Sequence, residues 1–98
     1  MTDEATRPRI VIPGNAQHIG ARNEQQDSFG FSAFDAAEFV SHAGFLSVVA
    51  DGMGGLALGK DSSATAVRTF LATYGAKEPA EKIPGVLDRG LHAANRAV

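Results

Sequence analysis

The order of the elements in this sequence predicts an α+β fold. Short segments rich in Val, Ile and Phe lie between residues 9 and 50, and two segments with helical spacing of apolar residues follow, between residues 61 and 98. Strands that precede helices favour separate β and α layers over alternating βαβ units. The 98 residues are 44% hydrophobic and 20% charged, a composition that is typical of one folded domain.

Two strands are predicted before residue 35. Arg9–Ile12 is short and β-branched, and the turn signal Pro13-Gly14 ends it. Ser28–Phe34 follows a polar stretch. In this segment Phe29 and Phe31 are two residues apart, which places them on one face of a strand.

The third predicted strand, Phe45–Ala50, has the clearest pattern. The segment that leads to it, Asp35–Ala43, mixes acids, alanines and a histidine and is interpreted as a hairpin connection. Phe45–Ala50 is mostly apolar, rich in valine and bounded by Gly44 and Gly52. Its near-continuous hydrophobicity predicts burial on both faces of the strand.

Two helices are predicted in the second half. Asp61–Tyr74 has apolar residues at helical spacing, with Asp61 or Ser62 as its N-cap and Gly75 at its C-terminal end. The second helix follows the connection formed by residues 77–84. Its periodic apolar residues are Val86, Leu87, Leu91, Ala94 and Val98.

The composition excludes several classes of protein. The absence of cysteine excludes a disulfide-bonded scaffold, a thiol nucleophile and a cysteine zinc site. The net charge of −2 argues against a nucleic-acid-binding protein, and the apolar runs are too short to cross a membrane. The first ten residues lack the pattern of a signal peptide. We therefore expect a cytoplasmic chain in which residues 1–8 are flexible and residues 9–98 form the folded part.

The turn after the third predicted strand contains a candidate site. Asp51-Gly52-Met53-Gly54-Gly55 leads from this strand towards the first helix. An acid at the end of a strand is well placed to hold a cation, and glycines let main-chain atoms approach a ligand closely. The alternative is a plain turn with a solvated aspartate, because Asp-Gly is also a common turn dipeptide. A phosphate-binding loop is disfavoured because neither G-x-x-x-x-G-K-[ST] nor G-x-G-x-x-G follows the strand.

Arg22 and Asp27 form a second candidate group, in the polar stretch before the second strand. The planar guanidinium of arginine suits phosphate oxygens, and Asp27 would be a second acidic group for a metal site. The alternative is an exposed ion pair that contributes little to stability.

The two groups together form a more specific pattern than either does alone. The pattern joins Gly20-Ala21-Arg22 and Gln26-Asp27-Ser28-Phe29 to the string Val49-Ala50-Asp51-Gly52-Met53-Gly54-Gly55. It resembles the opening part of the metal-dependent serine/threonine protein phosphatases of type 2C, in their bacterial form. The resemblance runs from about His18 to the C-terminus, where Leu91–Val98 resembles the family's second helix. It implies the N-terminal portion of a four-layer α/β/β/α sandwich, in which two antiparallel sheets are flanked by helices.

The resemblance also implies a role for each matching residue. Asp51 matches the aspartate that bridges two divalent metal ions, and Gly52 matches the glycine whose carbonyl binds one of them. Arg22 matches the arginine that binds the substrate phosphate. Asp27 matches an acid near the metals, which either binds a metal directly or holds one of its ligands. The two ions, Mn²⁺ or Mg²⁺, would activate water for attack on a phosphoserine or phosphothreonine of a protein substrate.

The sequence departs from the family pattern in several places. Gln26 stands where many members have glutamate, and a neutral amide supplies no charge to a cation. Met53, the usual residue in bacterial members, stands where eukaryotic members have a histidine, and Leu56 stands where bacterial members often have one. No acid after Asp61 matches the family's later metal-binding aspartates.

The lack of counterparts for the later aspartates leads us to expect an incomplete site that is inactive in isolation, whereas Gln26 is not interpreted as inactivating. The chain would then depend on the remainder of the phosphatase domain or associate with itself. We expect no nucleic-acid and no membrane partner. The alternative function is a non-catalytic, phosphatase-like binding or regulatory module.

Overall fold

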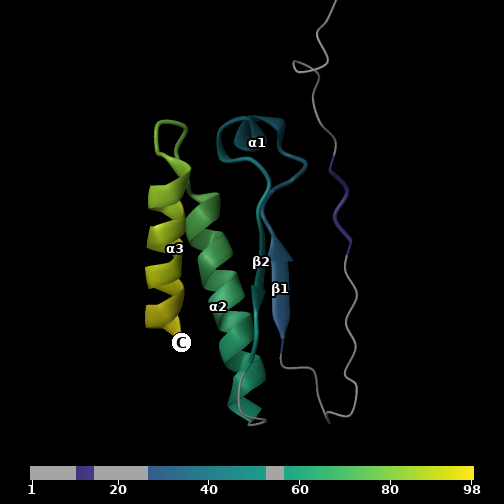
Figure 1. The fold of residues 1–98 in the computed structure, drawn as a ribbon, viewed down its shortest axis with the longest axis vertical. Helices are drawn as coiled ribbons and strands as arrows, with labels where there is room; N and C mark the ends of the chain where they lie inside the picture. The colour runs from purple at the N-terminus through teal and green to yellow at the C-terminus, as the bar shows by residue number, and fades with distance from the viewer. Residues whose placement is uncertain (1–10, 15–26, 53–56) are drawn as a thin grey trace, which may run out of the picture.

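The computed structural model describes residues 11–14, 27–52 and 57–98. These residues form an α+β arrangement, as the sequence predicts, with two strands and three helices in the described part (Figure 1). The elements follow the order β1 (Ser28–Phe31), α1 (Ala37–Ala43), β2 (Ser47–Ala50), α2 (Ala57–Gly75) and α3 (Ile83–Ala97).

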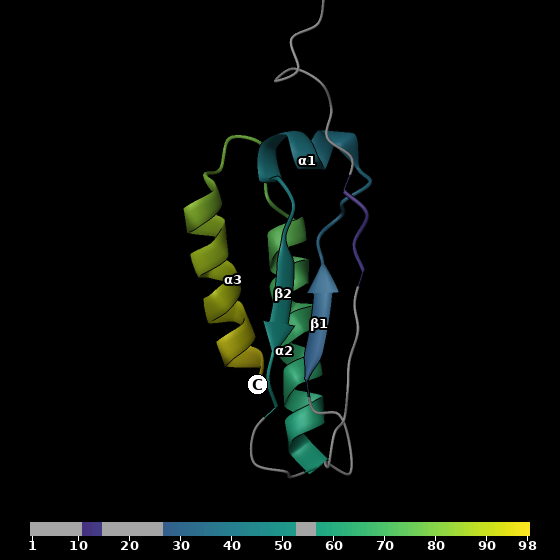
Figure 2. The same ribbon diagram turned by 45° about the vertical axis from the view of Figure 1, so that its right-hand side comes forward.

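The two strands form an antiparallel pair, which is covered by α2 on one face. Ser28 lies opposite Ala50, and Phe31 lies opposite Ser47. Figure 2 shows the strands in front of α2, with α3 beside that helix. A Cβ atom at Gly30 would lie 2.5 Å from Leu71 Cδ1. The missing side chain therefore lets β1 approach α2 closely.

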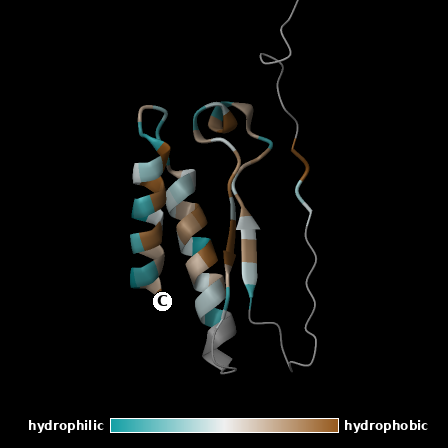
Figure 3. Cartoon of the chain, viewed as in Figure 1, coloured by the Kyte–Doolittle hydropathy of each residue, from teal (hydrophilic) through white to brown (hydrophobic). Residues whose placement is uncertain are grey.

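The opposite face of the sheet, which we call the open face, is covered by no described helix, and Val11, Pro13 and Gly14 border it only beside Phe31. The rings of Phe29 and Phe31 meet edge to face there, with centroids 5.9 Å apart, which agrees with their predicted place on one strand face. Val49, opposite Phe29, is 73% exposed although β2 is strongly hydrophobic (Figure 3). The predicted burial of this strand on both faces is wrong for the described residues, because α2 covers only the face to which Val48 and Ala50 belong.

The segment Asp35–Ala43 is not the simple hairpin connection that the sequence suggested, because it contains α1. Glu38 in the first turn suits the helix dipole, and Gly44 ends the helix with a φ of 67°. The segment still connects two paired antiparallel strands. Its helical form is favoured by an anchor on α2 that lies about 30 residues away in the sequence.

That anchor is Tyr74, which is 2% exposed and donates a hydrogen bond of 2.6 Å from its hydroxyl to the carbonyl of Ala43. The ring of Phe39 packs edge to face on Tyr74, with centroids 6.0 Å apart. Lys77, 5% exposed, places Nζ 3.1 Å from Nδ1 of His42. We call this region, where α1 meets the end of α2, the α1 end of the sheet.

Both strands are shorter than predicted, since β1 ends at Phe31 and β2 begins at Ser47. The first predicted strand and the predicted start of the first long helix also differ from the structure. Val11 and Ile12 lie outside any strand, and Ile12 is 87% exposed. Proline at position 13 cannot donate a hydrogen bond to a neighbouring strand, and Arg9 and Ile10 of the predicted strand lie outside the described residues. Helix α2 begins at Ala57, so Asp61 and Ser62 are inside the helix and neither is its N-cap.

The two predicted long helices are confirmed. Gly75 is the last residue of α2, and α3 packs against α2 with Val86 only 1% exposed. Within the described residues, neither helix has both the length and the apolar character needed to cross a membrane.

Candidate functional site

Asp27 and Asp51 lie at one end of the sheet, opposite to the α1 end. The last paired residues at this end are Ser28 of β1 and Ala50 of β2. Asp27 immediately precedes the first of these and Asp51 immediately follows the second, so the antiparallel register places the two acids at the same end of the sheet. Figure 1 shows these ends of β1 and β2 side by side. We call this region, formed by Asp27, Ser28, Ala50, Asp51 and Gly52, the acid end.

Asp27 has an unusual environment for a carboxylate. Its side chain is partly buried, and its Oδ1 atom is buried without a hydrogen-bond partner in the part of the chain that the structure describes. A buried oxygen of an ionised carboxyl is costly to leave unpaired, and most buried polar atoms have a partner in protein, water or a bound ion. A divalent cation would satisfy this atom, so the residue fits the metal site that the resemblance implies.

Asp51 and Gly52 follow β2 directly. Asp51 is exposed, whereas Gly52 is buried. Continuing the alternation of side chains by one residue places positions 27 and 51 on the open face of the sheet, on the same side as Phe29 and Val49. Alternation therefore places both aspartates on the side of the sheet away from α2.

The described residues contain no cluster of three or more His, Asp or Glu side chains that could hold a metal ion. Magnesium and manganese prefer about six oxygen ligands, so two carboxylates and a main-chain carbonyl supply part of such a set. Arg22, Gln26 and the turn Met53-Gly54-Gly55-Leu56 lie outside the described residues. The phosphate-binding role of Arg22 therefore stays a prediction.

A pair of hydroxyl groups lies next to the two acids and was missed by the sequence reasoning. Ser28 Oγ and Ser63 Oγ are 3.0 Å apart, which links the first residue of β1 to α2. Ser63 is 3% exposed. The signal in the sequence is a serine four residues before Val67, on the stripe of α2 that faces the sheet.

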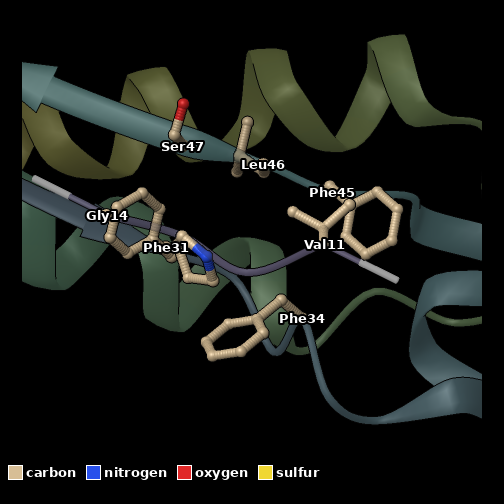
Figure 4. A pocket seen from close by; sticks show the side chains of 8 residues that line it. Val11, Gly14, Phe31, Phe34, Phe45, Leu46 and Ser47 are labelled. Carbon is tan, nitrogen blue, oxygen red and sulfur yellow. The ribbon is translucent and has the colours of Figure 1, made fainter. Parts of the chain in front are cut away.

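The α1 end carries a pocket of a different character. Figure 4 shows Phe31, Phe34, Phe45 and Val11 around it, and its volume is about 210 Å³. The residues that line it are Val11, Pro13, Gly14, Phe31, Phe34, Phe45, Leu46 and Ser47. Since none of these side chains is charged, the pocket offers no anionic ligand for a cation, and the acid end remains the candidate site.

Comparison with known proteins gives no further assignment: no family model, no curated protein and no solved structure matches this chain.

Proposed function

We propose that this chain is part of a metal-dependent serine/threonine protein phosphatase of type 2C, and that its acid end binds Mn²⁺ or Mg²⁺. The observation that supports this most is the register of β1 and β2. It brings Asp27, whose buried Oδ1 has no hydrogen-bond partner among the described residues, to the same end of the sheet as Asp51. Two acids that lie 24 positions apart in the sequence thus share one end of the sheet.

The roles follow from the oxygen atoms at this end. The Asp51 carboxylate and the Gly52 carbonyl would hold the cations, and Asp27 would bind one through its buried oxygen or orient a bound water. Bound metal supplies an activated water molecule and neutralises charge on the phosphate. Arg22 would orient the phosphate of the protein substrate through its planar guanidinium.

The open face of the sheet supports the wider fold in this proposal. Val49 is 73% exposed and Phe45 is 41% exposed. Two-layer packing buries the apolar face of a sheet against another layer, so a second sheet over this face would remove that exposure. In the proposal, a second sheet completes the α/β/β/α sandwich and comes from the remainder of the phosphatase domain.

Manganese titration by calorimetry tests the cation site. We expect the unmodified chain to bind Mn²⁺, and we expect Asp51→Asn to weaken the affinity by at least about tenfold, because it removes a charged ligand. Asp88→Asn is the matched control, since Asp88 is an exposed acid on α3. An Asp51→Asn protein that binds Mn²⁺ as well as the control does would contradict the proposed site.

A phosphothreonine peptide separates catalysis from binding. Because the chain is expected to be inactive in isolation, the test uses the chain together with the remainder of the domain. The enzyme hypothesis then predicts phosphate release that requires Mn²⁺ and is abolished by Asp51→Asn. Tight binding of Mn²⁺ and of the peptide without phosphate release would instead support the non-catalytic module.

A further inference from the structure

Ser63 lies on the face of α2 that packs against the sheet, next to the acid end. Its side chain is 3% exposed, and its hydroxyl is 3.0 Å from that of Ser28, the residue next to Asp27. We propose that Ser63 is a positioning residue of the cation site. The Ser28–Ser63 hydrogen bond fixes the start of β1, and with it the Asp27 carboxylate, in the place where a cation can bridge Asp27 and Asp51. This inference rests on the proposed function.

Asp27 needs such an anchor because the pairing of β1 with β2 stops one residue short of it. Ser28 and Ala50 are the last paired residues, and Asp27 lies one residue beyond them. Within the described residues, the Oδ1 atom of Asp27 has no hydrogen bond to hold it. The position of this carboxylate therefore depends on the backbone of Ser28, which is fixed by Ala50 within the sheet and by Ser63 from behind.

The contact between α2 and β1 changes from apolar to polar towards the acid end. At Gly30 the contact is apolar, with Val67 and Leu71 against the strand. At Ser28, two residues closer to the acids, it is a hydrogen bond between two hydroxyls. An apolar contact tolerates sliding, whereas a hydrogen bond weakens steeply when its distance and angle change. A buried serine hydroxyl that fixes a distance is therefore better suited to the acid end than another apolar residue.

The geometry also separates positioning from ligation. Ser28 points to the α2 face of the sheet, while position 27 falls on the open face by alternation. Ser63 thus acts through the backbone of β1 and does not touch the ion.

A double-mutant cycle on Mn²⁺ affinity tests the proposal. Ser63→Ala and Ser28→Ala each remove the same hydrogen bond, and we expect each to weaken Mn²⁺ binding about three- to tenfold. The double variant should bind Mn²⁺ no more weakly than Ser63→Ala alone, because Ser28→Ala removes only a hydrogen bond that Ser63→Ala has already removed. Ser62→Ala, at the neighbouring position of α2, is the control and should bind as the unmodified chain does. Ser63→Thr keeps the hydroxyl and should retain the affinity.

A purely structural serine gives a different result. In that case Ser63→Ala lowers the unfolding midpoint and leaves the Mn²⁺ affinity unchanged, which would overturn the proposal. If Ser63→Ala does not fold, Ser28→Ala decides, because Ser28 is only half-buried. Failure of the unmodified chain to bind Mn²⁺ would overturn both this inference and the proposed function. Binding that neither serine substitution weakens would overturn this inference alone.

Discussion

The two ends of the β1–β2 sheet differ in how their polar groups are satisfied. At the α1 end, the Tyr74 hydroxyl is bonded to Ala43, and Ser32 exchanges two hydrogen bonds of 2.9 Å with Leu46. At the acid end, the described structure leaves the buried Oδ1 of Asp27 without a partner. Satisfied buried groups stabilise a fold, whereas an unsatisfied carboxylate oxygen lowers stability until a ligand binds it. We infer that the α1 end is structural and the acid end is functional.

The largest predicted change in stability comes from a substitution at the α1 end. Tyr74→Ala should lower the free energy of unfolding by about 3 to 5 kcal/mol, because it removes a buried aromatic ring and the partner of the Ala43 carbonyl. Burial raises the pKa of Tyr74, so the phenol stays a hydrogen-bond donor at neutral pH. Urea unfolding followed by circular dichroism measures the loss. Tyr74→Phe, which keeps the ring, should lose only about 1 to 2 kcal/mol. An unchanged free energy of unfolding in Tyr74→Ala would show that Tyr74 does not anchor α1.

A smaller effect of opposite sign is expected at the acid end. Asp27→Asn should raise the stability of the metal-free protein by about 1 kcal/mol, because it removes the charge from a carboxyl whose buried Oδ1 has no partner among the described residues. The same variant should lose the stabilisation that Mn²⁺ gives the unmodified chain by mass action. Thermal unfolding with and without Mn²⁺ measures both. Asp35→Asn, at an exposed position of the connection before α1, is the control. A destabilised metal-free Asp27→Asn would show that Asp27 is a structural residue.

The smallest predicted effect is a pKa change at Glu81, a carboxylate that has hydrogen-bond partners. A hydrogen bond of 2.7 Å from Arg89, together with one from the Glu78 amide, lowers the pKa of Glu81 from 4.5 to about 2. Because the folded-state pKa is lowered, the stabilisation is present above pH 4.5 and is lost as the pH falls towards 2. Arg89→Gln should raise the pKa of Glu81 towards 4.5 in an NMR titration of the carboxyl carbon. The Arg96→Gln control should leave it low. An unchanged pKa in Arg89→Gln would mean that another group sets it.

Local sequence patterns predicted those elements that pack one apolar face against a single neighbouring element. The periodic apolar residues of α2 and α3 pack against each other, and the valines of β2 form a strand as expected. The helix α1 was missed because its seven residues carry too short a pattern, and because its anchor, Tyr74, lies 31 positions from Ala43. Long-range contacts of this kind leave no periodic trace in the sequence.

The candidate site was predictable only in part. Asp27 and Asp51 were singled out by their motifs, but the pattern of either strand alone does not fix the register that brings them together. Register depends on the connection between the strands, and that connection contains the unpredicted helix α1. Ser63 was overlooked for a related reason: its partner, Ser28, lies 35 positions away.

Line broadening by Mn²⁺ in amide NMR spectra tests the central claim most directly, because it compares the two ends of the sheet in one experiment. The ion broadens signals of nearby nuclei, so the account predicts early loss of the Asp27, Ser28, Ala50 and Gly52 amides. The Ala43, Leu46 and Tyr74 amides at the α1 end should persist. Broadening that begins at the α1 end, or that affects Asp88, the exposed acid of α3, equally, would contradict a cation site at the acid end.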